Sequence, residues 1–300
     1  MDGVIVVDKP QGLTSHDVVA VARRLLKEKR IGHTGTLDPL ATGVLPLACG
    51  RATRLVRFLT ASDKDYDATI VFGVTTDTYD VTGTETTRSG LQPSREAVDD
   101  AVNRLRGEYD QVPPAYSAKK VAGRRAYEMA RDDEPVELRP VPVRVTRAEI
   151  RSFTGDRATV ALTCSAGFYV RSFANSLGQF VGTGACLEEL RRTRSGDFGL
   201  EGAASLDSLA EAAEDPGSNA GWLVPMEQLL TRLPAVRLTE EGRLRVSHGR
   251  EVDPAQAAPA GAWSPEPGAW VRLLDERGQL IALAQPGPTP GSLHPAVVLI

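Results

Sequence analysis

Apolar residues near the start of the chain form one short uninterrupted run, which is followed by a stretch with helical spacing. Residues 4–7 read Val-Ile-Val-Val and predict a buried strand. Positions 18, 21, 22, 25 and 26 are apolar and recur every three or four residues, so they share one face of a helix. Ser15 is placed to cap this helix, and Asp17 lies in its first turn, as the helix dipole favours. The chain is therefore predicted to open with a strand and an amphipathic helix.

Strands and helices continue to alternate up to about residue 213. Residues 73–91 are rich in Thr, Asp and Gly and predict a loop. Ser94 stands where a helix that runs to about Leu105 needs its N-cap. The other predicted elements are strands at 44–49, 66–72, 143–150 and 157–164, and helices at 52–59, 173–181 and 206–213.

The pattern changes near residue 233. The remainder of the chain predicts short strands and a single short helix that starts at Thr239. Residues 253–268 are rich in Ala, Pro and Gly and predict a long loop. This pattern fits a small β-barrel, so we expect a larger domain over residues 1–232 and a small one over 233–300. The predicted strands lie at 236–238, 270–275, 280–284 and 297–300.

Residues 112–142 form a basic and aromatic excursion between the predicted strands. Prolines flank the segment on both sides, and a short helix is predicted at 126–131. Two interpretations stay open from the residues alone. The segment is either a solvated hairpin or a clamp on a phosphate backbone. The cations that would form the clamp are Lys119, Lys120, Arg124 and Arg125.

Composition excludes several classes of protein. A chain of 300 residues that is 41% hydrophobic can bury a sizeable core. The three cysteines, Cys49, Cys164 and Cys186, lie far apart and lack the spacing of a zinc site, and their odd number does not favour a disulfide framework. The first residues contain only a short apolar run, and no stretch reaches membrane-spanning length. We therefore expect a cytoplasmic protein with no metal and no membrane association.

Charge is distributed unevenly along the chain. The net charge is −4, yet residues 1–60 hold nine Lys and Arg against five Asp and Glu, and residues 115–200 hold fourteen against ten. These two weakly positive stretches could meet in space and form a basic face for a polyanion. Ordinary solvated surface explains them equally well, so net charge by itself does not indicate nucleic-acid binding.

A single carboxylate stands in a loop of special composition at residues 32–45, Gly-His-Thr-Gly-Thr-Leu-Asp-Pro-Leu-Ala-Thr-Gly-Val-Leu. Glycine admits backbone angles that other residues resist, and proline fixes φ, so the segment predicts a shaped loop around Asp38. Such stretches are commonly surface turns. This one leads directly into a predicted buried strand, where loops often carry catalytic groups. Because the segment holds no second carboxylate, Asp38 predicts a nucleophile or a general base rather than a metal site.

Five motifs then occur in a fixed order. They are Val-Asp-Lys-Pro-Gln-Gly at 7–12, the Asp38 segment at 32–43, Lys-Asp-Tyr at 64–66, Pro-Pro-Ala-Tyr-Ser-Ala at 113–118 and Gly-Phe-Tyr-Val-Arg at 167–171. Their order and type closely resemble the bacterial TruB family, the tRNA pseudouridine-55 synthases, over roughly residues 3–230. The resemblance implies an α+β fold in which helices flank a mixed, mainly antiparallel central sheet. It also implies a C-terminal PUA-like β-barrel that binds RNA.

The resemblance implies a reaction as well. A uridine in the T-arm loop of tRNA, at position 55, would be isomerised to pseudouridine without cofactor or metal. Such a base has to leave its stack before a protein group can reach its glycosidic bond. The sequence shows no sign of oligomerisation, so we expect a monomer that binds the T-arm stem-loop.

Site residues follow from the matching motif positions. Asp38 corresponds to the nucleophile, and Arg171 corresponds to the arginine that pairs with it, which a guanidinium can do with two parallel contacts. Tyr66 corresponds to the aromatic residue that stacks on the target base and is placed to take part in proton removal from C5. The remaining matches are His33, which takes the place of the extruded base, Tyr169 and Leu190, which line the uridine pocket, and Lys9 and Tyr116, which shape or close the site.

One residue departs from what an RNA site favours. Asp65 places an acidic group next to Tyr66. Asp63, Asp65 and Asp67 alternate along the predicted strand, so we expect their carboxylates on one face and Tyr66 on the other.

Two other functions compete with the isomerase. A nucleoside or glycoside hydrolase also uses a carboxylate at an anomeric carbon, but retaining glycosidases need two carboxyl groups about 5–5.5 Å apart, and the site motifs supply only Asp38. An RNA-binding or tRNA-folding factor would need no catalytic groups. The presence of Asp38, Tyr66 and Arg171 argues against a purely structural role, although folding activity can coexist with catalysis.

Overall fold

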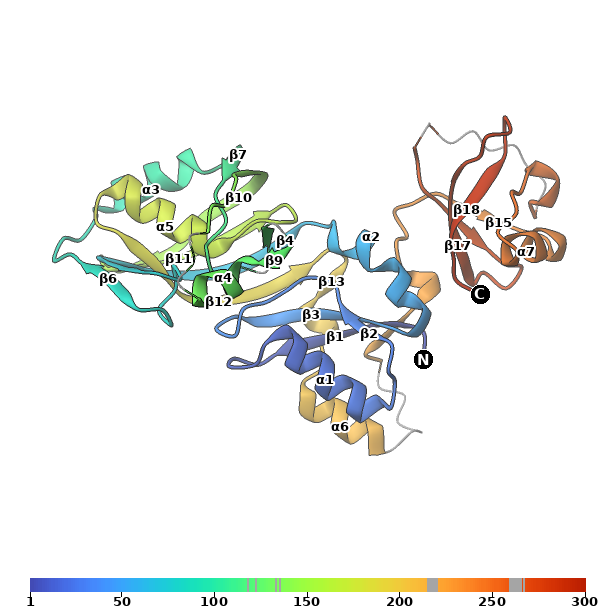
Figure 1. Cartoon of the computed structure of the whole chain (residues 1–300), viewed down its shortest axis with the longest axis horizontal. Helices are drawn as coiled ribbons and strands as arrows, with labels where there is room; N and C mark the ends of the chain where they lie inside the picture. Colours follow the sequence, from blue (N-terminus) through green and yellow to red (C-terminus); the bar gives the residue numbers. More distant parts are fainter. Residues whose placement is uncertain are drawn as a thin grey trace.

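The computed structural model describes all 300 residues except 118, 122, 133, 135, 215–220, 259–265 and 267. For residues 120, 121, 125 and 131 it describes the backbone alone. The larger part of the molecule is built on a ten-stranded sheet, and the last part of the chain forms a separate four-stranded sheet (Figure 1).

The ten-stranded sheet is mixed but mainly antiparallel. Its main path has the order β14-β1-β3-β12-β4-β11-β10-β7, with β2 beside β3 and β13 beside β12. Among the strand pairings of this sheet in the described part of the chain, that of β3 with β12 is parallel and the others are antiparallel, which confirms the predicted sheet type. The strands are β1 (Gly3–Lys9), β2 (Ile31–His33), β3 (Thr42–Cys49), β4 (Lys64–Phe72), β7 (Gly107–Gln111), β10 (Val141–Phe153), β11 (Arg157–Cys164), β12 (Ala185–Ser195), β13 (Phe198–Gly199) and β14 (Leu223–Pro225).

The short parallel pairing between β3 and β12 joins the two halves of the sheet. Arg191 lies opposite Thr42, and Arg192 lies opposite Gly43. Gly43 has φ +100°, and a Cβ there would lie 2.2 Å from the carbonyl oxygen of Arg192, so only glycine permits this approach. The end of the Asp38 loop is thereby held against β12.

Helices cover the sheet in two groups. The helices α1 (Ser15–Leu26) and α6 (Leu206–Glu214) pack against each other beneath β1, and α3 (Arg95–Arg104) packs against α5 (Val170–Val181) over the other half (Figure 1). The largest cluster of buried apolar side chains joins these helices to the sheet. The 3-10 helix η1 (Gly50–Leu55) and α2 (Val56–Thr60) connect β3 to β4, and two further 3-10 turns are η2 (Leu200–Gly202) and η3 (Met226–Gln228).

The predicted cap of α1 is wrong by one residue. Thr14, not Ser15, is the N-cap, and it forms a capping box in which its hydroxyl accepts from the Asp17 N–H while Asp17 accepts from the Thr14 N–H. Ser15 is instead buried inside the first turn. Ser94 caps α3 as predicted.

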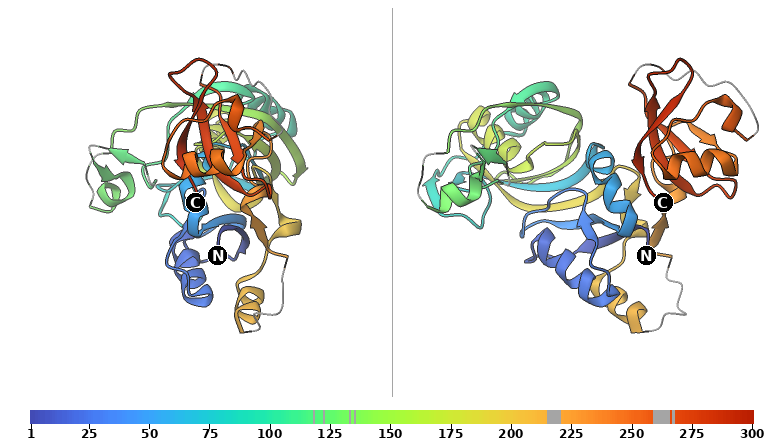
Figure 2. Two further views of the ribbon diagram at one scale, coloured as in Figure 1. Left: turned by 90° about the vertical axis from the view of Figure 1, so that its right-hand side faces the viewer. Right: turned by 45° about the vertical axis from the view of Figure 1, so that its right-hand side comes forward.

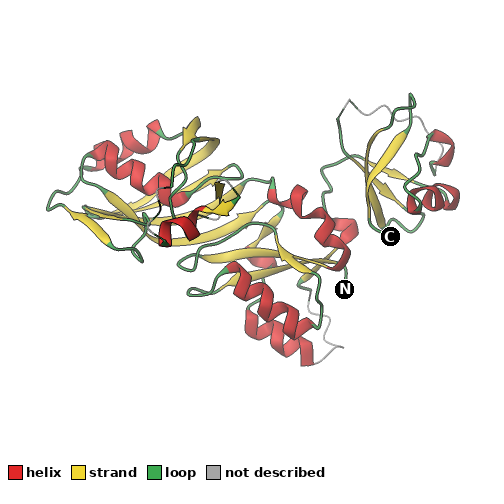
Figure 3. Ribbon diagram, viewed as in Figure 1, coloured by secondary structure: helices red, strands yellow, loops and turns green. Residues whose placement is uncertain are grey.

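Two further predictions need correction. The segment 73–91 is not all loop, because β5 (Val74–Thr76) and β6 (Glu85–Arg88) form a two-stranded ribbon within it. Strand β12 was absent from the predicted elements although it occupies the middle of the sheet (Figure 3). Its side chains do alternate between exposed and buried positions, but both kinds of position hold arginine, so the sequence shows no alternation of polar and apolar residues there. Arg191 is partly exposed, whereas Arg192 is only 1% exposed.

The basic excursion contains a small hairpin and a helix. Strands β8 (Lys120–Val121) and β9 (Arg124–Arg125) pair with each other, and α4 (Ala126–Arg131) follows at the predicted position. The excursion lies beside the loop region near the start of α5, since the carbonyl of Val112 accepts from Ser172 at 2.8 Å.

The C-terminal sheet has the order β15-β16-β17-β18. The predicted helix after residue 238 is α7 (Glu240–Ser247), and Thr239 is its N-cap. The last strand begins at Leu293, before the predicted position, and the segment 253–268 contains the 3-10 turn η4 (Pro254–Gln256), while part of it lies outside the described residues. The strands are β15 (Ala235–Arg237), β16 (Val271–Leu274), β17 (Leu280–Pro286) and β18 (Leu293–Val298).

The C-terminal sheet contacts the larger part of the molecule through η1 and α2 (Figure 2). The rings of Phe58 and Trp270 meet edge to face, with centroids 4.7 Å apart, and the guanidinium of Arg57 lies over both rings. Arg51 donates a hydrogen bond of 2.9 Å to the carbonyl of Leu299. Within the described residues, no helix is long and apolar enough to cross a membrane.

Candidate active site

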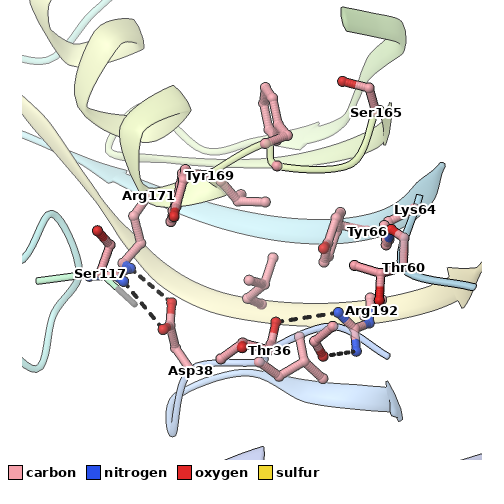
Figure 4. A pocket seen from close by; sticks show the side chains of 16 residues that line it. Thr36, Asp38, Thr60, Lys64, Tyr66, Ser117, Ser165, Tyr169, Arg171 and Arg192 are labelled. Carbon is pink, nitrogen blue, oxygen red and sulfur yellow. Dashed lines mark hydrogen bonds and ion pairs between the residues drawn. The ribbon is translucent and has the colours of Figure 1, made fainter. Parts of the chain in front are cut away.

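A pocket of about 240 Å³ lies between the Asp38 loop, β4, β12 and the start of α5 (Figure 4). It brings together residues that are more than a hundred positions apart in the sequence. Among the described residues that line it, Asp38 is the only carboxylate. The predicted site residues in its lining are Asp38, Tyr66, Tyr169, Arg171 and Leu190.

Asp38 and Arg171 form a two-point ion pair at one end of the pocket. The Nε of Arg171 lies 2.9 Å from Oδ2 of Asp38, and its Nη2 donates to Oδ1 at 3.2 Å. The Nε–H is not well aligned with its oxygen, so that contact acts through charge more than through hydrogen bonding. The side chain of Arg171 is 6% exposed and that of Asp38 is 37% exposed, so the carboxylate is the member of the pair that solvent or a ligand can reach.

Arg171 is fixed by further contacts. It donates to the carbonyl of Thr78 at 3.0 Å and to that of Tyr116 at 2.8 Å. A second buried carboxylate, Asp80, lies 3.7 Å from its Nε. Asp80 in turn accepts hydrogen bonds from Thr78 and from the backbone and hydroxyl of Thr82. The guanidinium is therefore held between two carboxylates, of which only Asp38 faces the pocket.

Backbone contacts shape the Asp38 loop. Ser15 on α1 exchanges two hydrogen bonds with the backbone of Leu37, the residue before Asp38. After it, the N–H of Ala41 donates to the carbonyl of Asp38 at 3.0 Å and closes a turn. The N–H of Gly12 donates to the carbonyl of Pro39 at 2.8 Å, which ties the end of β1 to the same loop.

Tyr66 is buried on the pocket face of β4. Burial raises the pKa of its hydroxyl, and the neighbouring guanidinium of Arg192 partly opposes that shift. The acidic residues of β4 lie on its other face, as predicted, since Asp67 is exposed and Asp65 forms a two-point ion pair with Arg194 at 2.7 and 2.8 Å. The charge of Asp65 is thus neutralised away from the pocket.

Three predicted residues lie near the pocket without lining it. The Nζ of Lys9 donates to the carbonyls of Pro10 and Leu13, so it holds the turn after β1. The backbone of Tyr116 supports Arg171, as described above. The N–H of Gly35 points to Nδ1 of His33 at 3.4 Å, and the ring of His33 meets that of His16 edge to face at 5.2 Å.

The cations of the excursion are partly engaged. Arg124 forms ion pairs with Asp132 and Glu134, each at 2.8 Å. Lys119 donates to the carbonyl of Arg139 at 3.3 Å. The side chains of Lys120 and Arg125 lie outside the described part of the chain.

Comparison with known proteins identifies the family to which this chain belongs. The model described as "TruB family pseudouridylate synthase (N terminal domain)" matches residues 23–170, and that described as "tRNA pseudouridylate synthase B C-terminal domain" matches residues 171–231. The chain belongs to the TruB family. Together the two matches contain Asp38, Tyr66 and Arg171, and they end just before the C-terminal sheet.

Three curated relatives of this TruB chain share the name "tRNA pseudouridine synthase B". A protein from Solibacter usitatus is 44% identical over 302 residues and covers 100% of both chains. One from Pseudomonas aeruginosa is 37% identical over 287 residues, which is 95% of this chain and 92% of the relative. One from Geobacter sulfurreducens is 45% identical over 253 residues, which is 83% and 82% of the two chains.

Solved structures show the same TruB-type fold. The structure described as an H/ACA RNP bound to a substrate RNA containing 2'-deoxyuridine matches with a TM-score of 0.76 at 26% identity, over 99% of this chain and 85% of that one. The Cbf5-Nop10-Gar1 complex matches with a TM-score of 0.75 at 27% identity, again over 99% and 85%.

Sequence reasoning about this TruB chain missed four residues around the pocket. Asp80 lies in a segment that was predicted to be a loop, and Gln111, which exchanges two hydrogen bonds with the backbone of Tyr169, lies on an unpredicted strand. Lys64 and Arg192 line the pocket from β4 and β12. An alternating pattern at 190–192 was the available signal for Arg192, because an inward Leu190 also places position 192 inward.

Proposed function

We propose that this TruB-family chain is a tRNA pseudouridine synthase that isomerises the uridine at position 55, in the T-arm loop, to pseudouridine. The observation that carries the proposal is the pairing of Arg171 with the solvent-accessible Asp38 in a pocket of about 240 Å³. The names of the curated relatives support tRNA as the substrate.

The reaction requires one bond to break and another to form. The C1′–N1 bond of uridine breaks, the base turns, and a C1′–C5 bond forms, while C5 loses a proton and N1 gains one, so atoms balance. Asp38 is the nucleophile of this reaction. Arg171 aims the carboxylate through two contacts and stays charged throughout, and Asp80 fixes the guanidinium from behind.

Aromatic and apolar residues would hold the extruded base. A base drawn out of an RNA loop needs a stacking surface. Tyr66 and Tyr169 supply rings in the pocket, and Leu190 supplies an apolar wall. Tyr66 is also placed to take part in removing the C5 proton. His33 would fill the position that the base vacates, with Lys9 and Tyr116 supporting the loops around the site.

RNA binding would extend beyond the pocket. We propose that residues 1–232 form the catalytic domain and that 233–300 form a PUA-like module that binds RNA. The excursion at 112–142 would contact the RNA backbone through its remaining cations. The protein would act as a monomer, without metal or cofactor.

Incubating the protein with an unmodified tRNA transcript and mapping pseudouridine chemically tests reaction, substrate and position at once. We expect one pseudouridine, at position 55. Release of free uracil would instead indicate a nucleoside hydrolase. Binding of tRNA without any pseudouridine would indicate an RNA-folding factor.

A further inference from the structure

Two buried cations lie at the end of the pocket that is remote from Asp38. Lys64 is 6% exposed and Arg192 is 1% exposed, and both line the pocket beside Tyr66 (Figure 4). Figure 4 shows them on the opposite side of the pocket from the Asp38–Arg171 pair. Neither cation takes part in the proposed reaction as described above.

Backbone carbonyls satisfy only part of the hydrogen-bonding capacity of these cations. The Nζ of Lys64 donates to the carbonyls of Thr60 and Ser62, which leaves one of its three N–H groups. Arg192 donates through Nε to Val44 at 2.7 Å and through its terminal nitrogens to Gly35 at 3.2 Å and Thr36 at 3.4 Å. A guanidinium has five N–H groups, and Arg192 also forms a side-chain hydrogen bond with Tyr66, so one remains.

No carboxylate within the described residues forms an ion pair with Lys64 or Arg192. Asp63 attracts Lys64 only at longer range, and it lies 3.8 Å from Arg144. Asp38 is engaged by Arg171. Burying two like charges without a partner is costly, and proteins normally pair buried charges. The Asp38 end of the pocket is therefore neutralised internally, whereas the Lys64–Arg192 end is not.

The two cations face one small patch of the Asp38 loop. A Cβ built on Gly35 would lie 3.6 Å from Nη1 of Arg192 and 4.0 Å from Cε of Lys64. Both side chains therefore reach van der Waals range of the same point of the loop. This juxtaposition places a point-like ammonium and a planar guanidinium side by side, a combination that suits a tetrahedral oxyanion.

We propose that Lys64 and Arg192 form a binding subsite for a phosphodiester of the RNA substrate that flanks the flipped uridine. The inference rests on the proposed function and deepens it. The phosphodiesters are the anionic groups of RNA at neutral pH, and a uridine drawn into the pocket carries its flanking phosphates with it. The subsite would use this charge to hold the extruded nucleotide against Tyr66.

The electrostatics of the pocket agree with this assignment. Burial, together with the charge of Arg192, lowers the pKa of Lys64 to about 8. A bound anion would raise the pKa of Lys64 again, because a negative charge nearby favours the charged form of the lysine. A phosphate bound here would therefore also offset the repulsion between the two cations.

A neutral phosphate analogue tests the subsite directly. T-arm stem-loop RNAs are prepared with a single methylphosphonate at the linkage 5′ or 3′ of the target uridine, and Kd is measured by fluorescence anisotropy. In the wild type, one of the two neutral linkages should weaken binding about tenfold, as expected for a lost hydrogen bond to a charged group. Lys64→Met should bind the natural RNA more weakly and lose little more affinity with the same methylphosphonate.

The matched control is Lys29→Met, which removes the same charge from an exposed position. It should keep the full methylphosphonate effect of the wild type. A thermal melt shows whether Lys64→Met folds. If Lys64→Met does not fold, Lys64→Gln is used in its place. The proposal is overturned if neither linkage matters in the wild type, or if the Lys64 variant keeps the full loss.

Pseudouridine formation on the natural stem-loop is measured with the same wild-type sample. If pseudouridine forms while the methylphosphonates have no effect, only the phosphate subsite is wrong. If no pseudouridine forms, the proposed function fails and the subsite loses its basis with it.

Discussion

Ser15 and Leu37 exchange two hydrogen bonds that join the start of α1 to the loop carrying Asp38. The hydroxyl of Ser15 donates to the Leu37 carbonyl at 3.1 Å and accepts from the Leu37 N–H at 2.8 Å. Ser15 is 1% exposed and Leu37 is 3% exposed, so water cannot replace either bond. The residue before the proposed nucleophile is thus held by a side chain from a different element.

Ser15→Ala should lower both the stability and the rate of catalysis. The change leaves a buried N–H and a buried carbonyl unpaired, which costs about 1–3 kcal/mol each, and it frees the Asp38 loop to shift. We expect a lower Tm together with a lower kcat. Thr14→Ala is the control, because it removes the helix cap at a cost of about 0.5–2 kcal/mol but leaves Leu37 bonded. An equal loss of kcat in both variants would contradict a specific role for Ser15.

Asp38→Asn should abolish pseudouridine formation and leave RNA affinity within about twofold of the wild type. The substitution is isosteric and keeps the loop, but it removes the negative charge and the nucleophile. Pseudouridine mapping and a binding titration on the same preparation measure the two effects. Substantial turnover by the variant would rule out Asp38 as the nucleophile.

Asp80→Asn should reduce kcat with little change in Kd. An amide can still accept from Thr82, but it no longer balances the charge of Arg171 from behind, so the pairing of Arg171 with Asp38 is perturbed. The expected loss is about 10–100-fold, or about 1.4–2.8 kcal/mol in the barrier. Asp77→Asn is the matched control, since among the described residues the Asp77 carboxylate accepts a hydrogen bond from the N–H of Thr84 and does not contact Arg171, so the variant should keep full activity. Equal effects of the two changes would exclude a role for Asp80 through Arg171.

Alanine at Lys119, Lys120, Arg124 and Arg125 together should weaken RNA binding and flatten its dependence on salt. Each lost phosphate contact in a single-stranded region lowers the slope of log K against log salt by about 0.7. Because Arg124 is paired with Asp132 and Glu134, we expect the decrease to be smaller than four full contacts. Affinity measured across a salt series decides between the two interpretations, and an unchanged slope would identify the segment as a solvated hairpin.

RNA binding should weaken as pH rises through about 8. The phosphate subsite binds the charged form of Lys64, whose pKa in the free protein is about 8, so its contribution is present below that pH and is lost above it. The other groups that act on Lys64 are Arg192, Asp63 and Cys164, and burial raises the pKa of the Cys164 thiol to about 12, so the thiol does not titrate in this range. Binding titrations at a series of pH values should show this loss of affinity above about pH 8 in the wild type and should not show it in Lys64→Met. Identical pH profiles would contradict it.

Local patterns predicted the elements whose signals lie within a few residues. The cap at Ser94, the short helix near Thr239 and the strands around Tyr66 and Leu162 needed only periodicity and capping chemistry. The error at Ser15 came from two adjacent hydroxyl residues that compete for one cap. Thr14 is the N-cap because Asp17, three residues later, completes the capping box with it.

Other features depended on distant partners. Strand β12 lies in the middle of the sheet because it pairs with β3 on one side and with β4 on the other. Arg192 can be buried on this strand because its N–H groups donate hydrogen bonds to the carbonyls of Gly35, Thr36 and Val44. Asp80 becomes part of the site only when the ribbon of β5 and β6 is placed against Arg171. No spacing along the chain encodes such contacts.

The sequence by itself determined the loop around Asp38, the order of the motifs and the resemblance to the TruB family, because backbone preferences of glycine and proline act locally. Only the tertiary structure decided which charges are compensated. Two-point contact leaves Arg171 neutralised by Asp38, whereas Lys64 and Arg192 form no ion pair within the described residues. Electrostatic energy depends on distance in space and on burial rather than on separation along the chain, so that balance emerges only after folding.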